Sequence, residues 1–534
     1  MKSFRQAREM TADLIAGVSS VRRAGLLAHP AHRWGSAAAA LIRQGVSPAG
    51  FVAAGAALFP HRVFVQDERG AITYEEFNAR TDSLGNAFRG LGLGEGDRIG
   101  VLCRNHRYFL EAMVAAAKIG VDSVLLNTDL AGVRTLEIAA EQNLRTIVAD
   151  IEFHHRFAGG GTKPTLIGAW PGTHFDDLVA DYGDRRLIKP CRQGDQIILT
   201  SGTTGQAVAL PRVALERQPG TLAAIVERVP MRAGDPFFIG APLFHAWGFG
   251  NLTLALVLGA TVVLRNRFDP QTAIAAIAEH RVRSVALVPV MAQRLVDLPD
   301  AVFERYDVSS VTNVQLSGSA FNEEFYRRFR DRFGEVLFNA YGSTEVGGIS
   351  YASPVDIAMA PDTAGLPLRG TVITIRDAHG KVVPTGDTGA IHVRRTLSAY
   401  GHTPPRSLVR TGDIGHIDSQ GRLFITGRID DMIVSGGENV YPSEIEKLLA
   451  SIPEIVEAAV VGVTDAEFGQ RLRAWVVLTP TSTLTVDEIR SFVKSNLARY
   501  KVPRDVYVVS ELPRNSTGKI VKRLLQGVAD SESL

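Results

Sequence analysis

From about Val63 onward, short apolar runs alternate with longer segments whose apolar residues have helical spacing. The clearest series predicts strands at residues 99–103, 122–126 and 146–149, with helices at 108–118 and 135–142. This order is typical of parallel sheets covered by helices, whose ligands bind in loops at the carboxyl ends of the strands. Similar strands at 285–288, 311–316 and 336–338 predict a second unit of the same kind.

The pattern changes after Gly370 to short strands and tight turns, at 372–376, 389–393 and 423–425, which predicts an antiparallel β subdomain. After Gly427 it predicts helices at 442–451 and 486–498, with strands at 456–463, 473–479 and 506–509. We therefore expect an α/β protein with a basic, helical N-terminal extension (1–55) and two further domains. The large domain (56–429) would hold two βαβ-type subdomains and the β subdomain. A small α+β C-terminal domain (430–534) would follow.

Two segments raise the question of a membrane. Residues 236–264 contain no Asp, Glu, Lys or Arg, but Pro242, Asn251 and four glycines interrupt them, so strand, loop, helix and strand are expected. Residues 1–50 carry seven basic and two acidic side chains. They could make a peripheral contact with anionic lipid, or form a solvated helix packed across the domain behind. Glu9 and Asp13 interrupt any secretory signal.

Composition and charge narrow the classes of function. The 534 residues are 45% hydrophobic and 21% charged, so a large packed core is feasible and a small binding module is not expected. The net charge of +2 gives no field for binding a nucleic-acid backbone, so no nucleic-acid partner is expected. Cys103 and Cys191 are too few for a disulfide framework or a Cys-based zinc cluster, which suits the cytoplasm, and both are expected to be buried.

A run of small hydroxyl residues and glycines follows the strand-like residues 196–199: Thr200, Ser201, Gly202, Thr203, Thr204 and Gly205. Such a loop can bring backbone N–H groups and hydroxyls close around phosphate oxygens. Alone, it is equally compatible with a surface turn.

Further motifs follow in order: PLFH (242–245), LSGSA (316–320), NAYGSTE (339–345), RTGD (410–413), GRIDD (427–431), GGENVYPSEIE (436–446) and PRNSTGKI (513–520). Over roughly residues 55–525 the chain resembles the adenylate-forming superfamily of acyl- and aryl-CoA synthetases, peptide-synthetase adenylation domains and firefly luciferase. The resemblance implies an enzyme that makes an acyl-adenylate from a carboxylic acid and Mg·ATP, releasing pyrophosphate. It would then transfer the acyl group to coenzyme A and release AMP, without a covalent enzyme intermediate.

The resemblance also implies a nucleotide pocket. Asp413 would accept hydrogen bonds from the ribose hydroxyls, with Arg428 supporting the sugar. Glu345 would hold Mg²⁺, because this cation takes only one or two carboxylates besides phosphate oxygens. The structural alternatives are a turn residue for Asp413, a surface ion pair for Arg428 and a solvated side chain for Glu345. The other implied members are Thr344 at the α-phosphate, Tyr341 near the adenine, and Ser319, Ala320, Asn339 and Gly342.

A mobile C-terminal domain is implied as well. Lys519 would meet the carboxylate and the α-phosphate as charge builds up, and a solvated surface lysine is the alternative. Rotation at the hinge, Asp430, would move Lys519 out and bring Gly436, Gly437 and Glu438 in to line a coenzyme A tunnel.

His245 would lie between the acyl pocket and the phosphates, or else be a hydrogen-bonded core histidine. Trp247, Gly248, Phe249 and Gly318 would line the acyl pocket, with the glycines leaving room. No charged side chain there can pair with an α-amino group, so we expect a fatty acid of medium or long chain. An aryl acid is the alternative, and the oligomeric state is left open.

The phosphate loop departs from the family pattern, because QAVA (206–209) replaces the usual continuation Pro-Lys-Gly. A lysine there would balance charge on the β- and γ-phosphates, so Val208 is expected to weaken binding on the pyrophosphate side. One interpretation is a working ligase that relies on backbone donors, Mg²⁺ and Lys519, and the other retained motif residues favour it. The other is an impaired homologue that binds lipid or nucleotide at a membrane surface. Residues 400–406 also look abbreviated.

Overall fold

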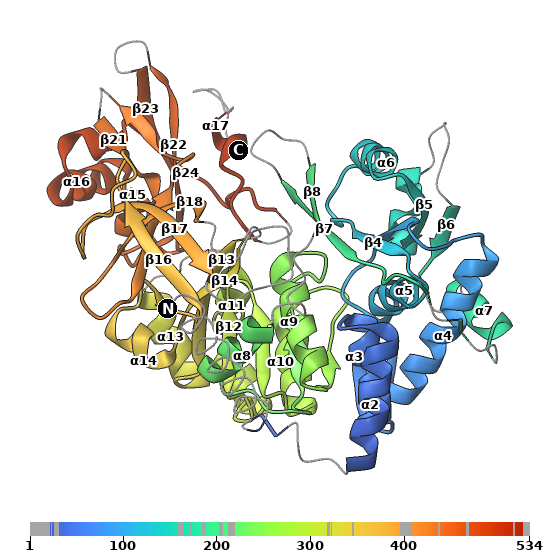
Figure 1. Ribbon diagram of the computed structural model, residues 1–534. Helices are drawn as coiled ribbons and strands as arrows, with labels where there is room; N and C mark the ends of the chain where they lie inside the picture. Colours follow the sequence, from blue (N-terminus) through green and yellow to red (C-terminus); the bar gives the residue numbers. More distant parts are fainter. Residues whose placement is uncertain are drawn as a thin grey trace, which may run out of the picture. The chain divides into compact units, whose positions relative to one another are not determined.

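In the computed structural model the described residues form two compact units, those up to Gln315 and those from Leu316 on, which are treated separately (Figure 1). The described residues are 22, 24–25, 31–157, 165–169, 174–183, 187–188, 190–201, 207–211, 219–317, 321, 323–343, 346–395, 408–435, 438–465, 469–515 and 518–526. None of the helices in these ranges is long and apolar enough to cross a membrane.

Helices α2 (Ala31–Gln44) and α3 (Pro48–Leu58) lie near the start of the described part of the first unit. They pack against each other, and α3 also contacts α4 (Tyr74–Gly90). The Ser47 side chain accepts a hydrogen bond from the N–H of Gly50 and so caps α3. This part of the basic N-terminal segment is therefore a packed helix pair, although Ile42 on α2 is 80% exposed. A membrane contact stays a prediction.

A six-stranded sheet of the first unit has the order β6-β5-β3-β4-β7-β8, parallel except for β8. Its strands are β3 (Arg98–Leu102), β4 (Asp122–Leu125), β5 (Leu144–Ala149), β6 (Thr165–Gly168), β7 (Gln196–Ser201) and β8 (Ala207–Pro211). Helices α5 (Arg107–Lys118) and α6 (Gly132–Glu141) join β3 to β4 and β4 to β5, which confirms the predicted alternation. The 3-10 helix η1 (Ile151–Phe157) and α7 (His174–Asp181) flank β6. Since the chain leaves β3 and β5 toward opposite sides, their carboxyl ends form a topological switch point.

A second set of strands in the first unit has the order β2-β1-β10-β9-β11-β12. They are β1 (Val63–Asp67), β2 (Gly70–Thr73), β9 (Phe237–Ile239), β10 (Val262–Val263), β11 (Ser284–Leu287) and β12 (Asn313–Leu316), the last residue of which is the first of the second unit. β1 is parallel to β10, and the Thr261 hydroxyl donates to the carbonyl of Val63, 198 residues earlier. The helices of this region are α8 (Pro219–Arg228), α9 (Ala246–Val257), α10 (Pro270–Glu279), α11 (Pro289–Val296) and α12 (Asp300–Arg305). Residues 236–264 thus form the predicted strand, loop, helix and strand.

The second unit contains antiparallel strands in the order β16-β17-β18-β19-β15-β14-β13. They are β13 (Leu337–Ser343), β14 (Gly347–Ala352), β15 (Thr363–Pro367), β16 (Thr371–Arg376), β17 (Gly389–Arg395), β18 (Val409–Ile417) and β19 (Leu423–Arg428), with helices α13 (Glu323–Phe333) and α14 (Pro354–Met359). Ile375, Ile391 and Leu423 lie in one buried apolar cluster. The antiparallel β subdomain predicted after Gly370 is therefore present.

The last part of the second unit has α+β structure. Its strands are β20 (Ile433–Ser435), β21 (Glu438–Val440), β22 (Ile455–Asp465), β23 (Gly469–Leu478) and β24 (Asp505–Val508), and its helices are α15 (Pro442–Leu449), α16 (Val486–Asn496), η3 (Arg499–Lys501) and α17 (Lys522–Gln526). β24 is parallel to β23, and the other described pairs are antiparallel. The α/β fold class is confirmed. The domain bounds, the hinge at Asp430 and the mobility of this part stay predictions.

Candidate nucleotide-binding site

Three predicted site residues meet on strands of the second unit. Asp413 on β18 and Arg428 on β19 are register partners, and Arg428 Nη1 lies 3.5 Å from Asp413 Oδ1. Tyr341 on β13 donates its hydroxyl hydrogen to Asp413 Oδ2 at 2.5 Å. Gly412 has φ of +81°, which glycine adopts without strain, and a side chain there would lie 3.2 Å from Arg428. The structure therefore brings the proposed ribose residues together with Tyr341.

Asp413 sits in an environment that opposes its charge. It is 8% exposed, and burial raises the pKa of its carboxyl group by more than Tyr341, Arg428 and the Lys519 ammonium lower it. Burial and the Asp413 charge also raise the pKa of Tyr341. When ionised, Asp413 is therefore a strong hydrogen-bond acceptor, and further donors such as hydroxyl groups would stabilise its charge.

Thr411 is a supporting residue that sequence reasoning left without a role. Its hydroxyl accepts a hydrogen bond from the N–H of Asp413 at 3.2 Å and donates to the carbonyl of Ile391 at 3.2 Å. The hydroxyl thus connects β18 to β17 beside the carboxylate. Its place in the RTGD motif, two residues before Asp413, was the available signal.

Asn339 and Gly342, two other predicted pocket members, are engaged in β13. Asn339 Nδ2 donates to the carbonyl of Thr363 at 3.2 Å. A side chain at Gly342 would lie 2.5 Å from the carbonyl oxygen of Gly347 on β14, so glycine permits the close strand pairing. Both positions have a structural explanation, and their contact with nucleotide stays a prediction.

Several predicted residues of the phosphate loop, the nucleotide and acyl pockets, the metal site and the coenzyme A tunnel lie outside the described residues: Gly202, Thr203, Thr204, Gly205, Gly318, Ser319, Ala320, Thr344, Glu345, Gly436 and Gly437. Thr200 and Ser201 are the last residues of β7, so the strand extends two residues further into this run than the expected 196–199. Val208 lies on β8 as the register partner of Thr200. Glu438 lies on β21, opposite Ser435. Asp430 Oδ2 is 3.5 Å from Arg428 Nη2.

His245 immediately precedes α9 in the first unit. The N–H of Phe249 donates to its carbonyl at 2.9 Å, which is the first helical bond. Its Nε2 atom is buried and has no hydrogen-bond partner among the described residues. Burial lowers the pKa of the imidazole to about 4, so the ring is neutral at pH 7. The alternative interpretation was a hydrogen-bonded core histidine, but no described residue forms a hydrogen bond with Nε2.

The predicted acyl-pocket residues near His245 have clear packing contacts. Trp247 Nε1 donates to the carbonyl of Leu287 at 2.9 Å, and Phe249 is fully buried. A side chain at Gly248 would lie 2.2 Å from the carbonyl oxygen of Pro242. The expectation that Gly248 leaves room for the acid is therefore wrong on that side, because backbone fills the space. Whether these residues border an acyl chain stays a prediction.

The loop before His245 is held by Asn105, another residue that sequence reasoning missed. The Asn105 side chain donates to the carbonyl of Ala241 and accepts from the N–H of Leu243, both at 2.9 Å. It thereby fixes the backbone of the PLFH motif from the end of β3. Its position two residues after the strand predicted at 99–103 was the only signal, and it did not show whether Asn105 holds another loop or only forms a turn.

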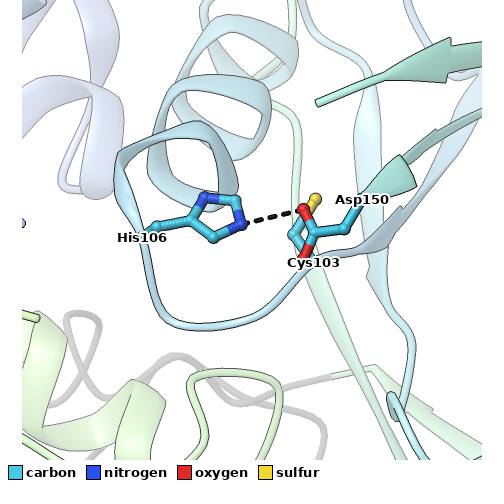
Figure 2. A group of neighbouring side chains, drawn as sticks. All are labelled: Cys103, His106 and Asp150. Atoms are coloured by element: carbon cyan, nitrogen blue, oxygen red, sulfur yellow. Dashed lines mark hydrogen bonds and ion pairs between the residues drawn. The ribbon is translucent and has the colours of Figure 1, made fainter. Parts of the chain in front are cut away.

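A second cluster of titratable side chains lies at the switch point between β3 and β5 (Figure 2). Among the described residues, ligating atoms of Cys103, His106 and Asp150 come within 4.8 Å of one another. His106 Nε2 lies 2.8 Å from Asp150 Oδ1, and the N–H of Arg104 donates to Asp150 Oδ2 at 2.9 Å. Burial and the Asp150 charge raise the pKa of Cys103 well above its usual range. We interpret this cluster as a hydrogen-bonded connection between the two strand ends.

The two cysteines differ in exposure. Cys103 is buried, as expected, but Cys191 is exposed. Cys191 lies in the loop before β7, where its N–H donates to the carboxylate of Glu95. The expectation of burial was wrong because composition does not reveal that this residue lies in a surface loop.

Comparison with protein families gives two matches. The AMP-binding enzyme family matches residues 52–401, and the AMP-binding enzyme C-terminal domain matches residues 444–519. The second match begins after Asp430 and includes Lys519.

Individual relatives cover nearly the whole chain. A feruloyl-CoA synthase of Amycolatopsis sp is 30% identical over 88% of this chain and 96% of its own length. The long-chain-fatty-acid–CoA ligase FadD13 of Mycobacterium tuberculosis is 28% identical over 85% and 92%. Among solved structures, the o-succinylbenzoate coenzyme A synthetase MenE of Bacillus subtilis, in complex with ATP and a magnesium ion, is 25% identical. It has a TM-score of 0.76 over 89% of this chain and 98% of that one.

Proposed function

Since the chain belongs to the AMP-binding enzyme family, we propose that it is a working ligase for a medium- or long-chain fatty acid. As an acyl-CoA synthetase it uses ATP, Mg²⁺ and coenzyme A. The observation that carries the choice of acid is the absence of charge in the segment after His245. Helix α9, which carries the predicted pocket residues Trp247, Gly248 and Phe249, has no charged residue. An uncharged lining suits an apolar chain better than an acid with a second charge.

An aryl acid is the second candidate. The feruloyl-CoA synthase at 30% identity supports it as much as the fatty-acid ligase at 28% supports the first. An apolar wall also accepts an aromatic ring. The cytoplasmic location and the peripheral membrane contact stay predictions.

The proposed division of work assigns binding and charge stabilisation to separate residues. Asp413 would accept the ribose hydroxyls, with Arg428 and Tyr341 fixing its orientation. Lys519 would stabilise the charge that builds up between the carboxylate and the α-phosphate. His245, neutral at pH 7, would offer a hydrogen bond without adding charge beside the acid. Mg²⁺ would be held by Glu345, which lies outside the described residues.

The deciding experiment incubates the protein with Mg·ATP, coenzyme A and a panel of acids. The panel covers fatty acids of increasing chain length, ferulate and succinylbenzoate, and AMP release is measured. AMP release that is highest with medium or long fatty acids supports the proposal. A preference for ferulate supports the aryl ligase. No acid-dependent AMP release across the panel would support the impaired, lipid- or nucleotide-binding homologue.

Lys519→Ala tests the catalytic assignment. Removing a group that stabilises developing charge typically costs about 100- to 1,000-fold in rate, so acid-dependent pyrophosphate exchange is expected to fall by about that factor. Lys494→Ala is the matched control, because Lys494 is an exposed lysine on α16 of the same unit. An exchange rate equal to that of the control would remove Lys519 from the mechanism.

Val208→Lys tests the departure in the phosphate loop. A lysine at this position of β8 restores a cation on the pyrophosphate side, so we expect faster pyrophosphate exchange or a lower requirement for ATP. Val208→Met, which adds length without charge, is the control. An unchanged exchange rate in Val208→Lys would show that the missing charge does not limit adenylation.

A further inference from the structure

The peptide group that joins Gly518 to Lys519 is held on both sides by side chains. The guanidinium of Arg514 donates to the carbonyl oxygen of Gly518. On the other side, the N–H of Lys519 donates to Asn515 Oδ1 at 2.9 Å. Because a peptide group is planar, holding its oxygen and its hydrogen fixes the plane from which the Lys519 side chain starts.

The surrounding backbone forms a narrow hairpin. The N–H of Val521 donates to the carbonyl of Pro513 at 2.8 Å, and the N–H of Asn515 donates to the carbonyl of Lys519 at 2.9 Å. Gly518 has φ of +74°, which favours glycine at this turn position. The hairpin hydrogen bonds fix the position of the Lys519 backbone. The side chains of Arg514 and Asn515 fix the tilt of the peptide group before Lys519.

Arg514 is in turn held by Glu457 on β22. Arg514 Nη2 lies 2.5 Å from Glu457 Oε1, and the two side chains are 24% and 25% exposed. A guanidinium has several donors in a fixed fork, so one side chain can bind the carboxylate and the Gly518 carbonyl together. β22 is a rigid base for this contact, because Ala459 and Val461 on it lie in a buried cluster with Leu512 and Leu525.

We propose that Glu457 and Arg514 are positioning residues that aim Lys519 for adenylate formation. The proposal rests on the catalytic role proposed for Lys519. Neither residue would touch substrate: Glu457 orients Arg514, and Arg514 orients the peptide group before the lysine. A tilt of that peptide moves the far end of the long lysine side chain, and small misplacements of a catalytic group cost up to about 100-fold in rate.

A positioning role for Glu457 and Arg514 would affect one half-reaction only, whereas a purely structural ion pair would affect both. Lys519 is assigned to the first half-reaction, and it would move out before the acyl group is transferred to coenzyme A. Loss of the aim should therefore slow adenylate formation and leave thioester formation from a preformed acyl-adenylate unchanged.

The test measures both half-reactions in Glu457→Gln and Arg514→Gln in the full-length protein. We expect pyrophosphate exchange to fall about 10- to 100-fold, with a lower kcat and little change in KM for ATP. Thioester formation from synthetic acyl-adenylate and the thermal unfolding midpoint are expected to match the parent. Arg514→Lys, which keeps the charge but loses the fork, should be intermediate. Asp487→Asn and Arg490→Gln on α16 are controls for the loss of charge.

Three outcomes decide the matter, with Lys519→Ala measured in parallel. If Lys519→Ala leaves exchange unchanged, the catalytic role of Lys519 fails, and this proposal fails with it. If Lys519→Ala slows exchange while Glu457→Gln and Arg514→Gln match their controls, the positioning role alone is overturned. If both half-reactions fall equally together with the unfolding midpoint, the ion pair is structural and the positioning role is also overturned.

Discussion

Two buried aspartates, Asp67 in the first unit and Asp413 in the second, have opposite shifts in pKa. They are 3% and 8% exposed. Burial raises the pKa of Asp67, but the hydrogen bonds and charge of Arg107 outweigh burial and the net pKa is lowered. Arg107 Nη2 lies 2.5 Å from Asp67 Oδ1, and the N–H of Arg69 donates to the same oxygen at 3.0 Å. At Asp413 the effect of burial outweighs that of Arg428, and the net pKa is raised, because Arg428 Nη1 lies 3.5 Å from Asp413 Oδ1.

The difference separates a carboxylate used for folding from one that can take a ligand. The oxygens of Asp67 are enclosed by donors of its own chain, so the ion pair is complete. Asp413 Oδ1 is farther from Arg428 than a normal hydrogen bond, which leaves acceptor capacity beside the Tyr341 contact. Burial alone therefore does not distinguish the two aspartates, whereas burial with incomplete pairing makes Asp413 the candidate for binding a ligand.

The largest expected effect that tests this comparison is on folding, in Asp67→Asn. The change leaves Arg107 buried without its counter-ion, which typically costs about 3–5 kcal/mol. The free energy of unfolding, measured by urea titration, is expected to fall by about that amount. Asp487→Asn is the control, because that side chain is 92% exposed. A loss no greater than in the control would break the distinction between the two aspartates.

A smaller effect, and on activity, is expected for Asp413→Asn. An amide oxygen is a weaker acceptor than a carboxylate, and hydrogen bonds to charged groups contribute about 1.5–3 kcal/mol. We expect kcat/KM for ATP to fall by about 10- to 100-fold while the free energy of unfolding changes by less than about 1 kcal/mol. Unfolding as severe as that of Asp67→Asn, with normal ATP kinetics in the folded fraction, would contradict the assignment.

The smallest effect is the pH dependence of stability. The folded pKa of Asp67 lies below its unfolded value of about 3.9, so its contribution is present above that pH and is lost as the pH falls through the folded pKa. The folded pKa of Asp413 lies above the unfolded value, so stability is lost as the pH rises through that window. The free energy of unfolding of Asp67→Asn, relative to that of the parent, should therefore rise as the pH falls below about 4. For Asp413→Asn the same difference should rise as the pH increases above about 4. Unfolding titrations over this range would show parallel curves if the two sites were alike.

Local elements could be predicted from the sequence because their signals are local. The helix expected at 108–118 is α5 (Arg107–Lys118), and the strand expected at 456–463 is β22 (Ile455–Asp465). Pairing between distant segments left no such signal. Nothing in the apolar pattern of β1 indicates that its parallel partner is β10, because parallel pairing depends on the path of the whole chain.

The sequence predicted which residues belong to the candidate site but not how they contact one another. Asp413, Arg428 and Tyr341 were expected from their motifs, but the Tyr341–Asp413 hydrogen bond was not, since the two residues are 72 apart in sequence. Gly248 shows the opposite failure. In the sequence a glycine suggests free space, but in the folded chain the backbone of Pro242 fills that space.

The parallel pairing of β1 with β10 also limits the order in which parts of the chain can fold during synthesis. A ribosome adding about 5–20 residues per second needs roughly 10–40 s to synthesise the 198 residues that separate Val63 from Thr261. For most of that interval β1 and β2 have been synthesised, while β10, which pairs with the other edge of β1, has not. The six-stranded sheet, whose strands all lie within this stretch, can close first. Translation that stops before Val262 would leave an uncovered strand edge, the feature through which nascent chains associate with one another.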